Sequence, residues 1–357
     1  MKKIFTLIFM VNMALTAAAQ LEDGFYRIKN AKTDRYIVMY DPYVLVNKGT
    51  GTVNLSSLQT RGSFGFVSSH MGSIWYLEAK GDSQYDLYCQ HSSLGANSSG
   101  FYPKLWYNNG SYRVYGEYQG WTKYLGDADD EDTGEGYVSV SLPPDNPGVV
   151  WSFVPIGGDN YIGIEPETRA DGYYWATFMS GFPFQLGSGM TAYYVNNVDD
   201  NNFSMKEMGS EIPAKTPVLI RLNGGSASDN IITVKKNSNA AAPSDNKMYG
   251  VWYSSDLGGK HKDWNVECES DNRVLGESDG RLAFVKSSGY IEHNRGYIAV
   301  SANASSDIIE STSGISNIRV EQDAERAMYT LTGQKVPEGM TPRPGIYIKE
   351  GKKVVIK

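Results

Sequence analysis

Apolar and polar residues alternate in short runs along most of this chain, and Gly, Asn, Ser and Asp separate the runs. Tyr26-Arg27-Ile28 and Tyr36-Ile37-Val38 are two such runs, with a polar turn at Lys32-Thr33-Asp34 between them. Runs of this length and spacing predict short β-strands joined by turns. No apolar stretch keeps a 3.6-residue period, so the pattern predicts an all-β protein.

Three strand cores recur at nearly constant spacing in the first half of the chain. They are Trp75-Tyr76-Leu77, Tyr112-Arg113-Val114 and Trp151-Ser152-Phe153, and their first residues are 37 and 39 positions apart. An aromatic residue, a spacer and an apolar residue at this interval predict an internal threefold repeat of short strands. Residues 20–156 are therefore expected to form a β-trefoil-like domain.

Residues 160–309 carry a second series of predicted strands with a turn signal about every ten residues. The clearest are Tyr173–Phe178, Val218–Ile220, Arg273–Gly276 and Leu282–Val285. Strands of this length and spacing predict an antiparallel β-sandwich.

One catalytic pattern lies within this second region. Gly276-Glu277-Ser278-Asp279-Gly280 fits the G-x-S-x-G nucleophile elbow, which requires a strand-to-helix turn in an α/β sheet. Here the Asp-Gly pair is followed by the strand Leu282–Val285, which predicts a β-hairpin instead. The motif therefore carries no nucleophile, and the sequence contains no other catalytic constellation.

The first residues have the pattern of a secretory signal peptide. The basic Met1-Lys2-Lys3 is followed by the apolar run Ile4–Leu15 and by the small residues Ala17-Ala18-Ala19. This arrangement predicts a signal peptide over residues 1–19, with cleavage before Gln20. No later run approaches the length of a membrane-spanning helix, so no membrane span is expected after cleavage.

The last residues, 315–357, contain two predicted strands, one around Ile318–Val320 and one over Tyr329–Val336, and a predicted hairpin over Gly345–Ile356. Their sequence reads Tyr329-x-Leu331-x-Gly333-Gln334-x-Val336, then Pro344-Gly345-Ile346-Tyr347-Ile348, then Gly351-Lys352-Lys353-Val354-Val355-Ile356-Lys357. In order, spacing and position this segment resembles the C-terminal sorting domain of proteins exported by the type IX secretion system of Bacteroidetes. The alternative is an ordinary terminal β-module, since short motifs match by chance.

The resemblance of the tail implies a small C-terminal β-sandwich that serves as a sorting domain. It also implies that the type IX secretion machinery is a partner and that the protein is secreted or held at the outer cell surface. The residues that carry the sorting motif are Gly333, Gly345, Tyr347, Gly351, Lys352 and Lys353.

The first domain resembles the ricin-type β-trefoil lectins. The resemblance lies in the strand Tyr26-x-Ile28, the following Arg35-Tyr36-Ile37 and the closing Trp151-Ser152-Phe153-Val154-Pro155. Those lectins carry Gln two residues before the repeat Trp, where this chain has Ser73 and Val149. Gln119-Gly120-Trp121 spells the tripeptide outside the repeat spacing. The resemblance implies carbohydrate binding.

A carbohydrate site needs aromatic faces for the sugar ring and carboxylate or amide groups for its hydroxyls. Aromatic and acidic residues in the Gly- and Asn-rich stretches of the first domain supply both. The candidate ligand-binding residues are Trp106, Tyr107, Trp121, Tyr124, Asp127 and Asp129. The alternative is that these aromatic side chains belong to the core, because Trp and Tyr are mostly buried on average.

Charge and potential metal ligands exclude several classes of function. The formal net charge is −7 without any basic run, which argues against nucleic acid as a partner. The acidic run Asp127–Asp132 lacks the Gly and the distal Glu of an EF-hand calcium loop, and the four histidines have no paired spacing. No metal site and no cofactor are expected. Cys89 and Cys268 are expected to be free thiols, with a single disulfide as the alternative.

The sequence therefore predicts a secreted or cell-surface binding protein without enzymatic activity, whose partner is an extracellular glycan or a surface protein. Two other functions stay open. One is a glycan-active hydrolase with carboxylates on distant strands. The other is an adhesin or a trefoil-type peptidase inhibitor.

Overall fold

A computed structural model describes residues 21–39, 52–53, 58–61, 64–81, 84–90, 92–94, 104–108, 110–118, 120–129, 136–251, 268, 270–311, 328–330, 345–349 and 352–356. The chain divides into two compact units, residues 1–310 and 311–357. The described helices are all short: α3 (Phe64–Val67), η2 (Met71–Ser73), η3 (Pro147–Val149) and η4 (Ala227–Asp229). The all-β prediction is confirmed. The predicted signal peptide and its cleavage site lie outside the described residues.

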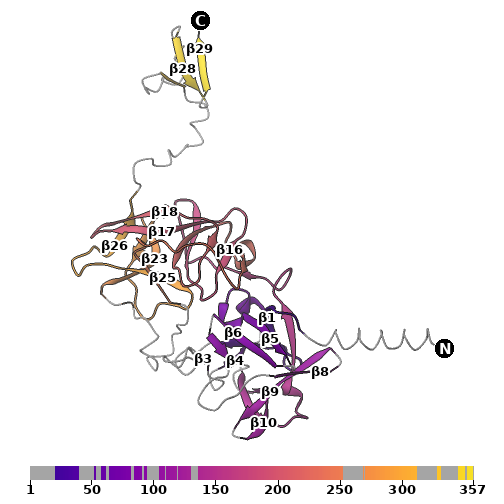
Figure 1. Ribbon diagram of the computed structural model, residues 1–357. Helices are drawn as coiled ribbons and strands as arrows, with labels where there is room; N and C mark the ends of the chain where they lie inside the picture. The colour runs from indigo at the N-terminus through magenta and orange to yellow at the C-terminus, as the bar shows by residue number, and fades with distance from the viewer. Residues whose placement is uncertain are drawn as a thin grey trace, which may run out of the picture. The chain divides into compact units, whose positions relative to one another are not determined.

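The first sheet contains twelve strands, drawn in indigo to magenta in Figure 1. They are β1 (Gly24–Asn30), β2 (Tyr36–Met39), β3 (Thr52–Val53), β4 (Leu58–Arg61), β5 (Trp75–Gly81), β6 (Gln84–Cys89), β7 (Ser92–Leu94), β8 (Lys104–Asn108), β9 (Ser111–Tyr118), β10 (Trp121–Asp129), β11 (Gly136–Leu142) and β12 (Val150–Pro155).

Six of these strands close into a barrel. The antiparallel pairings run β1–β5, β5–β6, β6–β8, β8–β9, β9–β12 and back from β12 to β1. Two further antiparallel pairs, β2–β4 and β10–β11, extend this sheet, and β7 pairs with the barrel strand β6. A six-stranded barrel extended by strand pairs of this kind is the arrangement of a β-trefoil, and residues 21–155 are called the trefoil lobe below.

The threefold repeat is present, but its register differs from the sequence prediction. Alternate barrel strands β1, β6 and β9 carry Tyr26-Arg27-Ile28, Tyr85-Asp86-Leu87 and Tyr112-Arg113-Val114, and their tyrosines are all buried. Trp75 and Trp151 lie on the other set, β5 and β12, together with buried Leu105 on β8. Tyr112 is therefore not equivalent to the two tryptophans, and the near-constant spacing of 37 and 39 residues mixed two kinds of strand.

The trefoil core explains why the two tryptophans are buried. Both Trp75 and Trp151 have no exposed surface. The indole N–H of Trp75 donates to the carbonyl of Ile37 at 3.2 Å, and that of Trp151 donates to Leu125 at 2.8 Å. Each indole thus fills the core and satisfies its single donor, as a buried tryptophan requires.

The rest of the first unit, residues 156–310, is called the sandwich lobe, and its strands form two sheets. The ten-stranded sheet contains β14 (Thr168–Ala170), β15 (Tyr173–Phe178), β17 (Thr191–Val198), β18 (Asn202–Glu207), β20 (Val218–Leu222), β22 (Met248–Val251), β23 (Asn272–Ser278), β24 (Arg281–Val285), β25 (Arg295–Ala299) and β26 (Asp307–Glu310). The four-stranded sheet contains β13 (Ile162–Gly163), β16 (Phe184–Leu186), β19 (Glu211–Ile212) and β21 (Ile231–Val234).

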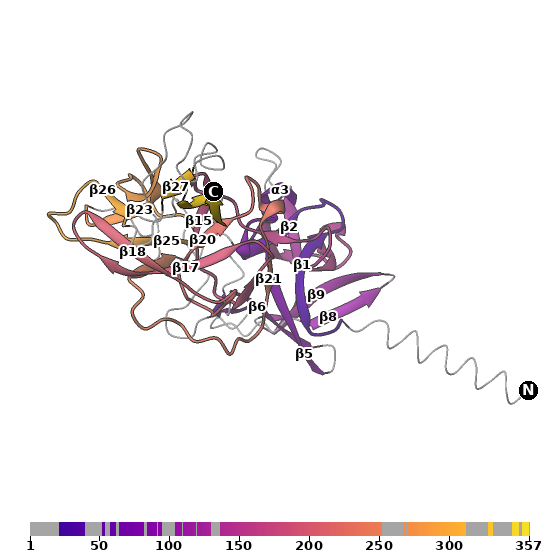
Figure 2. The same cartoon turned by 90° about the horizontal axis from the view of Figure 1, so that it is seen from above.

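Two apolar cores hold this lobe together. One lies between the two sheets and includes Phe178, Phe184 and Ile220, while the other lies on the opposite side of the large sheet and includes Phe203 and Phe284. Strand β20, labelled in Figure 2, runs between these cores, with Val218 and Ile220 in the first and Leu219 in the second. Apolar residues on both of its faces explain why Val218–Leu222 reads as a nearly continuous hydrophobic run.

The hairpin predicted at the G-x-S-x-G pattern is confirmed. β23 pairs with β24 in antiparallel register, and Ser278 lies directly opposite Arg281. Asp279 and Gly280 have φ angles of 52° and 76°, which is the type I′ turn that Asp-Gly favours. Ser278 donates to Asp307 at 2.7 Å, so its hydroxyl has a structural partner.

The two lobes share one apolar core. Met71, Ile74 and Tyr76 of the trefoil lobe belong to the same buried cluster as Phe178 and Phe182 of the sandwich lobe. Polar contacts fix the same junction. The amide of Asn294 donates to Gln90 Oε1 at 2.8 Å, and Arg27 donates to Asn160 at 2.6 Å. A junction with a buried apolar core restrains relative motion of the lobes more than a polar contact would.

The second unit contains a small antiparallel sheet in its described part. Its strands are β27 (Met328–Thr330), β28 (Gly345–Lys349) and β29 (Lys352–Ile356). β28 and β29 form the predicted hairpin, with Lys349 opposite Lys352. The strand expected at Ile318–Val320 lies outside the described residues.

Candidate functional site

The candidate site is the outer face of the paired strands β8, β9 and β10 in the trefoil lobe, which are labelled in Figure 1. In β9 the inward side chains Tyr112 and Val114 are buried, so Arg113 and Tyr115 point outward. The register carries this face onto the neighbouring strands, because Trp106 lies opposite Arg113 and Tyr124 lies opposite Tyr115. We call these four residues the aromatic strip.

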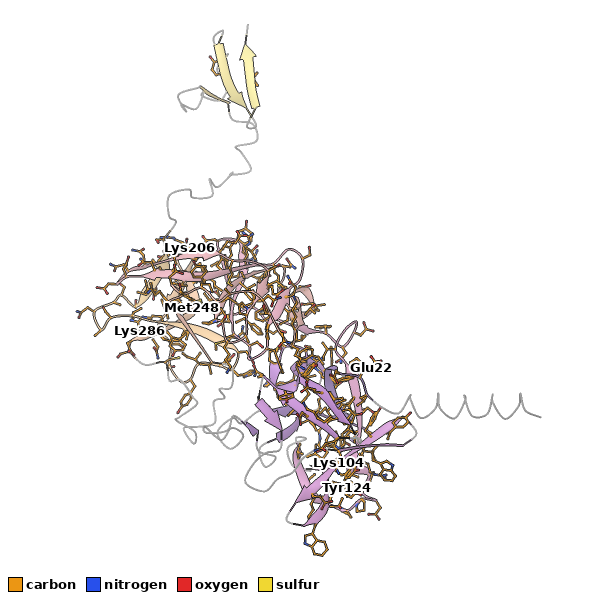
Figure 3. The ribbon with its side chains drawn as sticks, viewed as in Figure 1. Glu22, Lys104, Tyr124, Lys206, Met248 and Lys286 are labelled. Carbon is orange, nitrogen blue, oxygen red and sulfur yellow. The ribbon has the colours of Figure 1, made fainter. Side chains whose placement is uncertain are left out.

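The members of the aromatic strip contact one another in pairs. The guanidinium of Arg113 lies over the Trp106 ring, 4.9 Å from its centroid, and the rings of Tyr115 and Tyr124 are 5.9 Å apart. Trp106 is 49% exposed although it lies in the middle of a strand. Strand spacing and rise place Trp106 and Tyr124 about 12 Å apart across three strands. Lys104 and Tyr124, labelled in Figure 3, mark the two outer strands of this face.

Arg113 is held by its aromatic contact rather than by a carboxylate. Its Nε is buried and has no hydrogen-bond acceptor among the residues that the structure describes. The face of an indole attracts a guanidinium by the cation–π interaction, which gives about 0.5–2 kcal/mol. This arrangement holds Trp106 in a defined orientation with its surface open to solvent.

Two of the predicted aromatic residues lie off this face. Trp121 is 72% exposed, but its partner across the strands is Tyr118, so it lies on the opposite face of β10 from Tyr124. Tyr107 points inward and packs against the trefoil core, and its ring centroid lies 5.1 Å from that of Tyr112, with the two rings tilted by 49°. The structure therefore brings together only Trp106 and Tyr124 of the four predicted aromatic residues.

Asp127 is a correction to the predicted site, because it lies inside the protein. Its residue exposure is 4%, and its carboxylate forms a bidentate pair with Arg35 at 2.8 and 2.9 Å. The hydroxyl of Thr33 also donates to it. A carboxylate enclosed in this way joins β10 to the turn before β2, and it is not placed to receive a ligand. The side chain of Asp129 lies outside the described residues.

Arg113 and Tyr115 were not among the site residues predicted from the sequence. The available signal was the alternation in Ser111-Tyr112-Arg113-Val114-Tyr115, whose odd positions face solvent once the even positions are assigned to the core. Assigning that parity required knowing which face of β9 lies inside the barrel.

A second group of polar side chains lines a cavity of about 370 Å³ in the sandwich lobe. Arg295 is at its centre, with one of its nitrogens 3.6 Å from Glu167 and another 4.0 Å from Glu292. Burial raises the pKa of the Glu167 carboxyl, while Arg295 and the hydrogen bonds from Thr177 act in the opposite direction. The cavity therefore contains two carboxyl groups in different environments around one guanidinium.

A smaller cavity of about 240 Å³ lies at the junction of the lobes. The rings of His70 in the trefoil lobe and His293 in the sandwich lobe are in contact there, with centroids 4.1 Å apart and planes tilted by 33°. Burial, with a smaller contribution from Arg295, lowers the pKa of His293 to about 4. His293 is therefore neutral at neutral pH and can pack against a second ring.

The described residues include neither a grouped set of metal ligands nor an activated thiol. No three His, Cys, Asp or Glu side chains of the described ranges are grouped so that they could hold a metal ion. Cys89 and Cys268 are both free thiols, and burial raises the pKa of each. Neither has the lowered pKa of a catalytic cysteine.

The predicted sorting residues are only partly described. Gly345 and Tyr347 lie in β28, and Lys352 and Lys353 lie in β29, where Tyr347 is opposite Val354. Gly333 and Gly351 lie outside the described residues. In the described part of the chain, no helix has both the length and the apolar character needed to cross a membrane.

Comparison with known proteins gives only weak likenesses. No family model and no curated protein matches the sequence. The chain is similar to a designed threefold symmetric protein, ThreeFoil, with 14% identity over 38% of this chain and 100% of that one, at a TM-score of 0.28. It is also similar to the nicked CARDS toxin, with 13% identity over 81% of this chain and 54% of that one, at a TM-score of 0.19. Likenesses with such TM-scores carry no argument about function.

Proposed function

We propose that this protein is a secreted, non-enzymatic carbohydrate-binding protein that engages an extracellular glycan through the aromatic strip of its trefoil lobe. The observation that carries the proposal is the exposure of Trp106 beside Arg113 and the Tyr115–Tyr124 pair. Trp106 is one of several aromatic side chains grouped on one face of three strands, and grouped apolar surface that is open to solvent is typical of interaction sites.

The chemistry of the strip suits a sugar chain. Indole and phenol faces accept the apolar C–H face of a pyranose, while phenolic hydroxyls and the Arg113 guanidinium offer hydrogen bonds to its hydroxyls. Exposed side chains along about 12 Å of a sheet suit an extended oligosaccharide more than an enclosed monosaccharide. The resemblance to ricin-type lectins favours the same class of ligand.

Export by the type IX route is the second part of the proposal. It rests on the signal-peptide pattern of residues 1–19 and on the tail motif around Gly345 and Tyr347. The two patterns together describe transport across the inner membrane followed by sorting at the outer membrane. A carbohydrate-binding protein so exported would meet its glycan outside the cell.

A glycan array on the purified protein tests the binding proposal. Wild type is expected to bind one related group of saccharides, and Trp106→Ala is expected to lose that signal because the ring face is removed. Trp121→Ala is the matched control, since it removes an even more exposed tryptophan from the opposite face of the same strands. Absence of any bound glycan, or equal losses in both variants, would contradict the proposal.

A glycan-active hydrolase is the second candidate, favoured by Glu167 and Glu292 in one cavity. Glycosidases use two carboxyl groups, one of them with a raised pKa. Release of reducing ends from an array-positive oligosaccharide, abolished by Glu167→Gln, would replace the binding proposal with this one.

A further inference from the structure

The outer face of the sandwich sheet carries a second exposed aromatic group. Tyr249 in β22 lies directly opposite Tyr297 in β25, and the two rings are stacked with centroids 5.5 Å apart and planes at 26°. Tyr249 is 55% exposed although its neighbours Met248 and Val251 are buried. Met248, labelled in Figure 3, marks the position of β22. The next strand after β25 in this sheet is β23, which lies beside it in Figure 1.

This tyrosine pair borders the 370 Å³ cavity of the same lobe. Val274 in β23 lies opposite Tyr297 and lines the cavity. Arg295, two residues before Tyr297, is on the same face of β25 and also lines the cavity. The stacked tyrosines therefore lie on the same face of the sheet as two residues that line the cavity. A cavity of this volume lies in the range of small-ligand sites.

The polar groups of the cavity favour a neutral, hydroxyl-rich ligand. Arg295 already contacts two carboxyl groups and donates to the carbonyls of Glu165 and Thr177, so it is not available as an anion receptor. Glu292, whose side chain is 76% exposed, offers acceptor oxygens, and Ser287 and Tyr290 add hydroxyls to the lining. Carboxylates beside aromatic faces match the hydroxyls and C–H faces of a sugar.

We propose that Tyr249, Tyr297 and the cavity around Arg295 and Glu292 form a second saccharide-binding site, separate from the aromatic strip. This site shares no residue with the strip and lies on a different sheet. With two sites on one rigid unit, the protein binds one long polysaccharide at two places or bridges two chains, which raises its apparent affinity for polymers over oligomers.

Cys268 provides a direct reporter, because it lines this cavity, whereas Cys89 is fully buried in the trefoil core. The full-length mature protein is treated with iodoacetamide, with and without cellohexaose, laminarihexaose, xylohexaose or mannohexaose. Labelling of the Cys268 peptide is followed by mass spectrometry. At least one hexasaccharide is expected to slow the labelling of Cys268 several-fold, while Cys89 stays unlabelled and reports that the protein is folded.

Variants separate the two sites. Tyr249→Ala is expected to lose the protection and Tyr249→Phe to keep it, since the ring face and not the hydroxyl makes the contact. Trp106→Ala is expected to keep the protection, which distinguishes this site from the strip even if the strip binds no glycan. Labelling of Cys268 that no hexasaccharide slows, or protection that survives Tyr249→Ala and vanishes in Trp106→Ala, would overturn the proposal.

Discussion

Single residues on equivalent strands of the trefoil barrel have different roles. Trp75 and Trp151 are entirely buried and give their indole N–H groups to backbone carbonyls. Trp106 lies on the third strand of the same set but one position beyond buried Leu105, so it faces solvent. Neighbouring residues of a strand point to opposite faces of the sheet, so a tryptophan one position further along lies on the solvent face instead of in the core. Trp106 is such a residue, and it is a candidate ligand contact.

Asp127 provides a prediction at this scale. Asp127→Asn is expected to lower the free energy of unfolding by about 3–5 kcal/mol, because it leaves the buried Arg35 guanidinium without its carboxylate partner. The two side chains are 0% and 7% exposed, so solvent screening does not weaken the pair. Chemical denaturation at neutral pH measures the change.

Asp34→Asn is the matched control for this substitution. Asp34 pairs with Lys29 at 2.9 Å, but its side chain is 80% exposed, so its loss should change stability by about 1 kcal/mol or less. Asn also tolerates the φ of 61° at this position. Equal effects of the two substitutions would show that the Arg35–Asp127 pair is not the stabilising contact described above.

For the strands, local sequence patterns predicted where each strand lies better than they predicted which strands are equivalent in the threefold repeat. Alternation and turn residues were sufficient for β1, β2, β15 and the β23–β24 hairpin, because each depends on neighbouring residues. The register of the repeat was not predictable in the same way. Tyr26, Tyr85 and Tyr112 are 59 and 27 residues apart, and such unequal spacing conceals a repeat.

The candidate site was half predictable for the same reason. Composition identified Trp106 and Tyr124, but only the pairing of β8, β9 and β10 shows that Arg113 and Tyr115 join them and that Trp121 does not. Asp127 is of a residue type that often binds ligands, but it lies in the core. Long-range pairing decides between these roles, and a single sequence does not contain it.

The contact between α3–η2 and the segment before β25 gives a prediction of pH dependence. His293 contacts His70, and burial lowers its pKa to about 4 from an ordinary 6.5. Between these values the unfolded chain takes up a proton that folded His293 does not bind. Stability is therefore expected to fall as pH decreases from 6.5 towards 4, by up to about 3 kcal/mol from this residue.

His293→Phe isolates this effect, because a phenyl ring fills the space without titrating. The other charged groups at the cavity, Glu165, Glu292 and Arg295, are present in both proteins. The stability difference between wild type and variant should be constant above pH 7 and shift against the wild type as pH falls to 4. A difference independent of pH would show that His293 takes up its proton normally in the folded state.

At the level of the whole molecule, the chain combines a compact two-lobed unit with a separate C-terminal unit. The lobes share the apolar core around Phe178 and Tyr76, while the tail sheet of β27, β28 and β29 is a compact unit of its own. This division fits the proposal that the first unit binds a glycan and that the export machinery recognises the second unit.

Deletion of residues 315–357 tests that division of roles. In a host with the type IX system, the truncated protein is expected to be absent from the cell surface and the medium and to collect in the periplasm, which cell fractionation measures. The purified truncated protein should keep the glycan-array profile of the full chain. Normal export of the truncated protein would refute the sorting role of the tail.

Glycan binding by the aromatic strip is tested by comparing the affinity of wild type with the affinities of two tryptophan variants. Isothermal titration of the strongest array ligand is measured for wild type, Trp106→Ala and Trp121→Ala. Loss of a tryptophan contact at the centre of a site should weaken binding by about tenfold or more, so Trp106→Ala should bind at least that much more weakly. Trp121→Ala should match wild type. Equal affinity of wild type and Trp106→Ala would contradict the account.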